Sequence, residues 1–239
     1  MTWTRGPFGS VRDPFYSNVL LLLIPNGSVT AEQSPTHNTL TNDGMGISST
    51  HPYNGLNTYF GASGNIRLLG DDSIYYPLDA NEWCLEMWVK PVTEVFGTTE
   101  TRLQYLSSLK TEFDEANDRF LFNVQLSSSS YSASSSNGSV TTGNWYHLCL
   151  IRDNSPGGNS CAIRMSINGA LVTSTATFNI ADTVDDLNTA DSVLGGPFAS
   201  ISAWAGLRMT KGTRRYTSGQ NGYPSGYPFT PDPPYWPAA

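Results

Sequence analysis

The segment Glu82-Trp-Cys-Leu-Glu86 contains the best candidates for chemistry in this sequence. In a β-strand, positions i and i+4 share a face, and their Cα atoms lie roughly 13 Å apart at about 3.3 Å per residue. Two carboxylic acids can hydrolyse a glycosidic bond with retention when the carboxyl groups lie about 5–5.5 Å apart. Long side chains that lean towards each other can close this gap. Glycoside hydrolysis by Glu82 and Glu86 is therefore one candidate function.

The strand predicted around these glutamates has two different faces. The face expected to join the core consists of Trp83, Leu85, Met87 and Val89. The opposite face carries Glu82, Cys84, Glu86 and Trp88. Pyranose rings stack on aromatic side chains while carboxylates bond to sugar hydroxyls, so Glu82, Glu86 and Trp88 are predicted as carbohydrate-binding residues. The alternative is packing, which accounts for most aromatic residues in a chain that is 12% aromatic.

Other catalytic arrangements are not visible in the sequence. His37, His51 and His147 are far apart, and there is no Ser/His/Asp order, phosphate-binding loop or zinc-ligand spacing. The three cysteines, Cys84, Cys149 and Cys161, are predicted to be reduced residues that fill the core.

We predict no metal and no cofactor. Asp71-Asp72 in a turn could bind calcium, but adjacent carboxylates in a loop are usually only solvated.

Composition excludes several classes of partner. The 239 residues carry a formal net charge of −7 and are only 14% charged, so no overall positive field attracts nucleic acid. Residues 1–8 lack the apolar core of a signal peptide, and the longest apolar run, Val19–Ile24, is far shorter than the roughly 20 residues of a membrane span. We expect no membrane insertion and synthesis in the cytoplasm.

Both ends of the chain contain residues suited to attachment. We expect residues 1–16 to be an extended arm and residues 213–239 to be a tail, which is rich in Tyr, Gly and Pro. Large aromatic side chains in such segments favour packing on the chain's own domain or on a neighbour. Four cations near the last strand could meet an acidic surface or a phosphate, or could simply be a solvated strand end. The predicted partner-binding residues are Trp3, Phe8, Phe15, Arg208, Lys211, Arg214, Arg215, Tyr235 and Trp236.

Between these ends, apolar runs and turn residues predict a domain of strands over 17–212. Thr58–Phe60 and Ile66–Leu69 are expected to pair as a hairpin across a Gly-rich turn. Leu103–Leu109 and Arg119–Leu126 are further expected strands, with Thr111–Asp118 as an acidic connection.

Two other segments carry signals of their own. Ser127–Ser139 reads as an edge strand or a flexible loop. Asn168-Gly169, flanked by alternating apolar residues, predicts a two-residue type I′ hairpin, because both central positions need positive φ.

Several motifs, in order along residues 13–234, resemble those of laminin-G-like, concanavalin A-type domains, which are common in tailed-phage virion proteins. The matching segments are Asp13-Pro-Phe-Tyr-Ser-Asn-Val-Leu-Leu-Leu-Leu23, Glu82–Pro91, Trp145-Tyr-His-Leu-Cys-Leu-Ile-Arg152, Ile163–Val172, Leu207-Arg-Met-Thr-Lys-Gly-Thr-Arg-Arg-Tyr-Thr217 and Phe229-Thr-Pro-Asp-Pro-Pro234. The resemblance implies an all-β, two-sheet antiparallel sandwich of jelly-roll topology.

The resemblance also bears on function. Laminarinase-type glucanases share this fold and use Glu-x-Asp-x-Glu, but this sequence has Cys84 in place of the central Asp, which argues against an enzyme.

The expected function is a non-enzymatic phage virion structural protein. It would decorate the capsid or form a head or tail appendage, bind other capsid or tail proteins through its ends, and by analogy form a homo-oligomer. A receptor- or glycan-binding adsorption protein, with its site on the Trp88 face or around Ser127–Asn137, is the first alternative, and a glucanase is the second.

Overall fold

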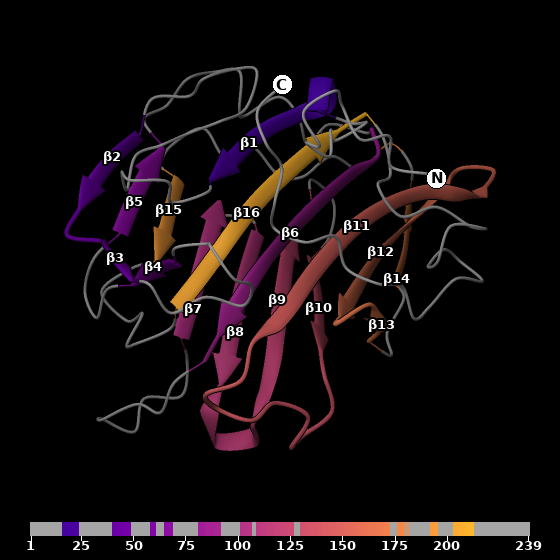
Figure 1. Ribbon diagram of the computed structural model, residues 1–239. Helices are drawn as coiled ribbons and strands as arrows, with labels where there is room; N and C mark the ends of the chain where they lie inside the picture. The colour runs from indigo at the N-terminus through magenta and orange to yellow at the C-terminus, as the bar shows by residue number, and fades with distance from the viewer. Residues whose placement is uncertain are drawn as a thin grey trace, which may run out of the picture.

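The computed structural model describes residues 16–23, 40–48, 58–60, 65–68, 81–91, 101–106, 109–126, 130–172, 176–179, 181, 192–195 and 203–212. Within these ranges the regular elements are antiparallel strands and two single-turn 3-10 helices, η1 (Tyr16–Asn18) and η3 (Glu115–Asn117) (Figure 1). None of the described helices is long and apolar enough to cross a membrane. The predicted all-β antiparallel fold is confirmed.

A nine-stranded sheet forms the larger layer. Its strands are β1 (Val19–Leu23), β3 (Gly46–Ser48), β4 (Thr58–Phe60), β6 (Trp83–Lys90), β11 (Tyr146–Gly157), β12 (Ser160–Ile167), β13 (Ala170–Leu171), β14 (Ala176–Asn179) and β16 (Ala203–Lys211). The main order is β13-β12-β11-β6-β16-β4-β3, with β1 paired to β16 and β14 paired to β12. The centre of this sheet is therefore β11, β6 and β16, which are far apart in sequence.

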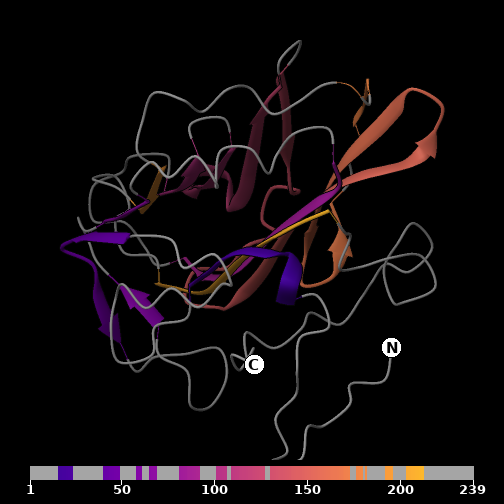
Figure 2. The same ribbon diagram turned by 90° about the horizontal axis from the view of Figure 1, so that it is seen from above.

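A four-stranded sheet forms the opposing layer. It has the order β10-β9-β8-β7, from β7 (Thr101–Leu106), β8 (Leu109–Asp114), β9 (Arg119–Gln125) and β10 (Ser130–Ser134). Figure 2 shows this sheet on one side of β1, β6 and β16. A third sheet, of order β15-β5-β2, contains β2 (Leu40–Asp43), β5 (Asn65–Leu68) and β15 (Ser192–Gly195), and β15 contacts β7.

The core lies between the two main layers. The larger sheet contributes the predicted face of β6, namely Trp83, Leu85, Met87 and Val89, together with Leu207 and Met209 of β16. The smaller sheet contributes Phe113, Phe120, Phe122 and Val124. Because strand side chains alternate, the remaining β6 residues Cys84, Glu86 and Trp88 lie on the outer face of the larger sheet.

The predicted type I′ hairpin is confirmed. Asn168 and Gly169 have φ angles of 51° and 79°, and they join β12 to β13. Asn168 also links this turn to β11, because its side-chain Oδ1 accepts the His147 N–H at 2.8 Å and its own N–H donates to the His147 carbonyl at 2.8 Å. The turn residue therefore fixes the position where β11 begins.

Two strand predictions are wrong. β4 does not pair with β5, since β4 pairs with β3 and β16 while β5 pairs with β2 and β15. A short Gly-containing connection looks the same in sequence whether it closes a hairpin or carries the chain to another sheet. The single strand expected at Leu103–Leu109 is divided between β7 and β8, and the first half of the expected acidic connection Thr111–Asp118 is part of strand β8. Of the two alternatives for Ser127–Ser139, the structure has an edge strand, β10.

Candidate functional site

Three central strands bring a buried polar group together on the outer face of the larger sheet. In the β6–β16 pairing Glu86 lies opposite Arg208, and in the β6–β11 pairing Trp88 lies opposite His147. A register shift between Ala205 and Arg208, with Gly206 at a φ of 59°, precedes this alignment. Such a bulge re-aims the side chains that follow it, which here places Arg208 on the same face as Glu86.

The Glu86 carboxylate is buried and has its polar partners within the protein. It is 1% exposed, and its Oε1 accepts a hydrogen bond of 2.6 Å from Arg208 Nε–H and contacts Arg208 Nη2. Its Oε2 lies 3.2 Å from His147 Nε2, and the His147 ring lies against Trp88 with centroids 5.1 Å apart. A buried carboxylate is tolerated only when paired, so Arg208 offsets the desolvation of Glu86.

The structure places the predicted carbohydrate-binding residues in different environments. Glu86 and Trp88 are 1% and 8% exposed, so both side chains are nearly covered. Glu82 precedes β6, is partly exposed, and accepts the Asn154 N–H at 3.3 Å through Oε1. The two glutamates therefore have separate partners.

The predicted partner-binding residues that the structure describes are Arg208 and Lys211. Arg208 is fully buried, whereas both sequence interpretations, a binding residue and a solvated strand end, place it at the surface. Its guanidinium is the counter-ion of the buried Glu86 carboxylate. Lys211 is partly exposed, and its carbonyl accepts a bond of 3.2 Å from Asn18 Nδ2. The other predicted positions, Trp3, Phe8, Phe15, Arg214, Arg215, Tyr235, Trp236 and the pair Asp71-Asp72, lie outside the described residues.

The three cysteines are buried and free, as predicted. Cys84 and Cys149 come from neighbouring strands, and their sulfurs are 3.4 Å apart. Burial, followed by the contact with Cys84 and the negative charge of Glu86, raises the pKa of the Cys149 thiol well above its usual value. Cys161 lies apart from this pair, with its Sγ 3.5 Å from the carbonyl oxygen of Asn179.

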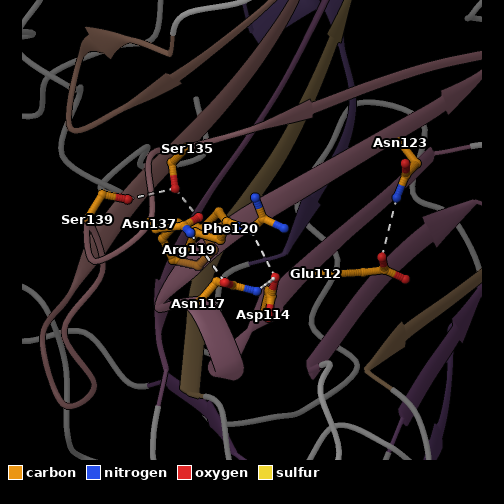
Figure 3. A network of polar contacts seen from close by, with 9 residues as sticks. All are labelled: Glu112, Asp114, Asn117, Arg119, Phe120, Asn123, Ser135, Asn137 and Ser139. Carbon is orange, nitrogen blue, oxygen red and sulfur yellow. Dashed lines mark hydrogen bonds and ion pairs between the residues drawn. The ribbon is translucent and has the colours of Figure 1, made fainter.

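A second polar cluster, which reaches the surface, lies where β8 turns into β9. Asp114 Oδ2 accepts hydrogen bonds from Asn117 Nδ2 at 2.8 Å and from Arg119 Nε–H at 2.9 Å (Figure 3). Burial acts to raise the pKa of Asp114, but these two bonds and the charge of Arg119 together lower it below its ordinary value. The sequence prediction does not include this cluster, although an Asp followed three residues later by Asn is a pattern typical of turns.

The connection between β10 and β11 is held against this cluster by its backbone. Backbone N–H groups of Ser135, Gly138 and Val140 donate to the carbonyls of Phe120, Asn117 and Asp118 at 2.9, 2.9 and 3.0 Å. Asn137, an exposed residue, donates from Nδ2 to Asn117 Oδ1 at 3.3 Å, and Ser139 donates to Ser135 Oγ at 2.7 Å. We call Asp114, Asn117, Arg119, Asn137 and Ser139 the surface cluster; Figure 3 shows these side chains gathered between the η3 turn and the loop.

Comparison with known proteins identifies the family. Residues 60–208 match Laminin_G_3 of the concanavalin A-like lectin/glucanases superfamily, and the chain belongs to this family. No curated protein sequence matches the chain.

Similar solved structures include three bacterial toxin domains. The binding domain of Paraclostridial Mosquitocidal Protein 1 has a TM-score of 0.59 at 11% identity, covering 84% of this chain and 50% of the other. The receptor binding domain of botulinum neurotoxin mosaic serotype C/D has a TM-score of 0.58 at 12% identity, covering 82% and 48%.

The third is a structure from a study of the cell entry of botulinum neurotoxin type C, which depends on two ganglioside molecules. It has a TM-score of 0.51 at 14% identity and covers 82% and 48%. The chain thus spans about half the length of the structures it matches, and at these identities the likeness shows a shared fold.

The Glu86–Arg208 pair generates a prediction about stability. Glu86→Gln should lower the free energy of unfolding by about 3–5 kcal/mol, because it leaves the Arg208 charge buried without its counter-ion. The control, Asp118→Asn, removes an exposed carboxylate and should change stability by less than about 0.5 kcal/mol. Urea denaturation followed by circular dichroism measures both. Equal stability of Glu86→Gln and the control would contradict a structural role for the pair.

The lowered pKa of Asp114 generates a prediction about acid stability. A carboxylate whose pKa is lower in the folded state stabilises the fold above its unfolded pKa of about 3.9, and this contribution is lost as pH falls through the folded value. The unfolding free energy should therefore fall less between about pH 6 and about pH 3 in Asp114→Asn than in the unmodified chain. Arg119→Gln should also reduce the fall, since it removes a group that lowers this pKa. An unchanged fall in both variants would refute the assignment.

Proposed function

We propose that this chain is a non-catalytic recognition module that binds the glycans of a receptor through its surface cluster. The observation that supports the absence of catalysis is the environment of Glu86. A catalytic acid or nucleophile must reach its substrate, whereas the Glu86 carboxylate is nearly fully buried and bonded to Arg208. One member of the acidic pair that suggested glycoside hydrolysis, Glu86, is therefore used for structure, which supports a module without catalytic activity.

The surface cluster has the chemistry that a sugar requires. It presents two side-chain amides, a guanidinium and a hydroxyl in one place, from Asn117, Asn137, Arg119 and Ser139, while the buried carboxylate of Asp114 holds Asn117 and Arg119 in position. An amide has two donor hydrogens and an acceptor oxygen and a guanidinium has five donor hydrogens, so contacts within the cluster use only part of this capacity. Because the backbone of the loop is fixed, little ordering is needed before binding.

The toxin domains of similar fold support the same proposal. Two of them are described as binding domains, and the entry of botulinum neurotoxin type C into cells depends on gangliosides, which carry glycans. The family to which this chain belongs includes lectins by its description. Sites on this fold are set by surface residues, so the position of the glycan on this chain is argued from its own cluster.

A glycan array tests this function. The purified chain should bind a defined set of glycans, and Asn117→Ala and Asn137→Ala should each weaken binding about tenfold, the effect of losing about 1.4 kcal/mol of hydrogen bonding. Asn144→Ala, at an exposed position of the same connection, is the matched control and should bind normally. The chain should release no reducing sugar from bound polysaccharide. Absence of binding across a broad array, or the same loss in the control, would refute the proposal.

A second candidate function is structural. The ordered motifs shared with tailed-phage virion domains favour a capsid decoration or a head or tail appendage, which would make the chain a component of the virion and a homo-oligomer. In this proposal, residues 1–16 and 217–239 attach the stiff sandwich to neighbouring capsid or tail proteins through their aromatic and proline-rich sequences.

Particle assembly tests the structural candidate. Deletion of 1–16 or of 217–239 should reduce incorporation of the chain into particles to about a tenth or less, as expected when an aromatic anchor of about 1.4 kcal/mol or more is lost. Quantitative mass spectrometry of purified particles gives the copy number. In the matched control, a Gly/Ser linker of equal length replaces the same residues. This variant should also show reduced incorporation into particles, because the linker lacks the aromatic and proline-rich sequence. Normal copy number in both deletions would exclude attachment through the ends.

A further inference from the structure

Cys84, Cys149 and Glu86 form a compact group of potential ligands on the outer face of the larger sheet. One oxygen or sulfur from each lies within 4.8 Å of the others, and all three residues are buried. Cys84 and Cys149 are 65 positions apart in sequence and meet only because β6 pairs with β11. Ligand spacing along the chain therefore could not reveal this group.

We propose that Cys84, Cys149 and Glu86 bind one divalent transition-metal ion of the zinc type. Two thiolates and a carboxylate suit zinc, which takes Cys and Asp or Glu ligands in tetrahedral geometry. Two sulfurs bound to one tetrahedral zinc at about 2.3 Å are about 3.8 Å apart. The observed 3.4 Å needs only a small opening of the thiol pair. The Glu86 oxygen lies within 4.8 Å of both sulfurs, so a small shift of the carboxylate that keeps its bond to Arg208 completes the site.

The charges balance in both states of the site. Without metal, two neutral thiols lie beside the Glu86–Arg208 ion pair, and the net charge of the site is zero. On binding, each thiol loses its proton to solvent, so the metal carries two positive charges against two thiolates, while Glu86 and Arg208 still cancel. The ion therefore enters a buried site without leaving net charge there, which is the condition for burying ions at all.

Arg208 has a further role in this arrangement. A carboxylate that ligates a metal through one oxygen is usually held by a hydrogen bond, and Arg208 provides such a bond to Glu86. His147, on the other side of the same carboxylate, limits its rotation. Both contacts orient the ligand.

Two buried hydroxyls give independent support. Ser166 lies opposite Cys149 in the β11–β12 pairing, and Thr210 lies opposite Cys84 in the β6–β16 pairing. Both side chains are fully buried, and neither Oγ nor Oγ1 has a hydrogen-bond partner in the part of the chain described. Buried hydroxyls without partners are rare and point to a water or an ion at the site. Since β11 and β6 lie between the strands of Ser166 and Thr210, a water in the fourth position on the metal would supply a partner to one of these hydroxyls.

A disulfide is the competing explanation for two close thiols. It would need the sulfurs to approach to about 2.05 Å, a larger movement than the opening required for zinc. It would also leave the hydroxyls of Ser166 and Thr210 unexplained. The geometry therefore favours the metal, and the experiment distinguishes the two.

The test uses the full chain, produced in zinc-supplemented medium, freed of any affinity tag and kept in a phosphine reductant without chelator. Inductively coupled plasma mass spectrometry should find about one zinc per chain, and Cys84→Ser and Cys149→Ser should each hold less than about a tenth of this amount. Cys161→Ser is the matched control, since Cys161 is equally buried but distant from the pair, and it should retain the metal.

Cobalt gives a measurement that does not depend on the variants. Chain produced with Co²⁺ should show a sulfur-to-cobalt charge-transfer band in the near ultraviolet and the strong visible bands of tetrahedral coordination. Unmodified chain without bound metal in either medium would overturn the proposal. So would equal metal in the Cys84 and Cys161 variants. An intact mass lower by two hydrogens, measured on metal-free chain purified without reductant, is the result for a disulfide and would also overturn it.

Discussion

The ion pair between Glu86 and Arg208 is the interaction on which the centre of the larger sheet depends. It joins β6 to β16, and a one-residue bulge in β16 is required to bring the guanidinium to the face where the carboxylate lies. The interior allows such a charge only with its partner in place, so the pair also specifies which residues of the two strands lie opposite each other. A shift of one residue in the register of β16 against β6 would turn the Arg208 side chain into the apolar core.

Sequence patterns predicted the parts of the fold that depend on neighbouring residues. Alternation in β6 assigned its two faces correctly, and Asn168-Gly169 specified a turn through backbone conformations that few other residues adopt. The error at β4 and β5 arose because the choice of partner strand is made by distant parts of the chain. For the same reason the environment of Glu86 was not predictable, since its partners are 61 and 122 positions away. The sequence placed Glu86 and Trp88 on one face of β6 but did not predict how far both side chains are buried.

The two polar clusters differ in how far water reaches them. The group around Glu86 is closed, neutral and placed among the central strands, where a polar side chain must satisfy its neighbours. The surface cluster lies at a strand turn, where Asn117, Arg119, Asn137 and Ser139 are at least partly exposed to water and Asp114 is buried beneath them. Carboxylates on a fold that includes both lectins and glucanases therefore cannot be assigned a role by residue type alone.

The loop between β10 and β11 has a consequence for how such a surface can evolve. Its course is held by main-chain hydrogen bonds to Phe120, Asn117, Asp118 and Pro91. Two of the donors, Gly138 and Gly143, have positive φ that favours glycine, while the backbone N–H groups of the others do not depend on the side chain. Exposed serine and asparagine side chains along it can therefore be exchanged without altering the path of the loop. Point substitutions at these exposed positions can therefore change the chemistry of the surface while the course of the loop is kept.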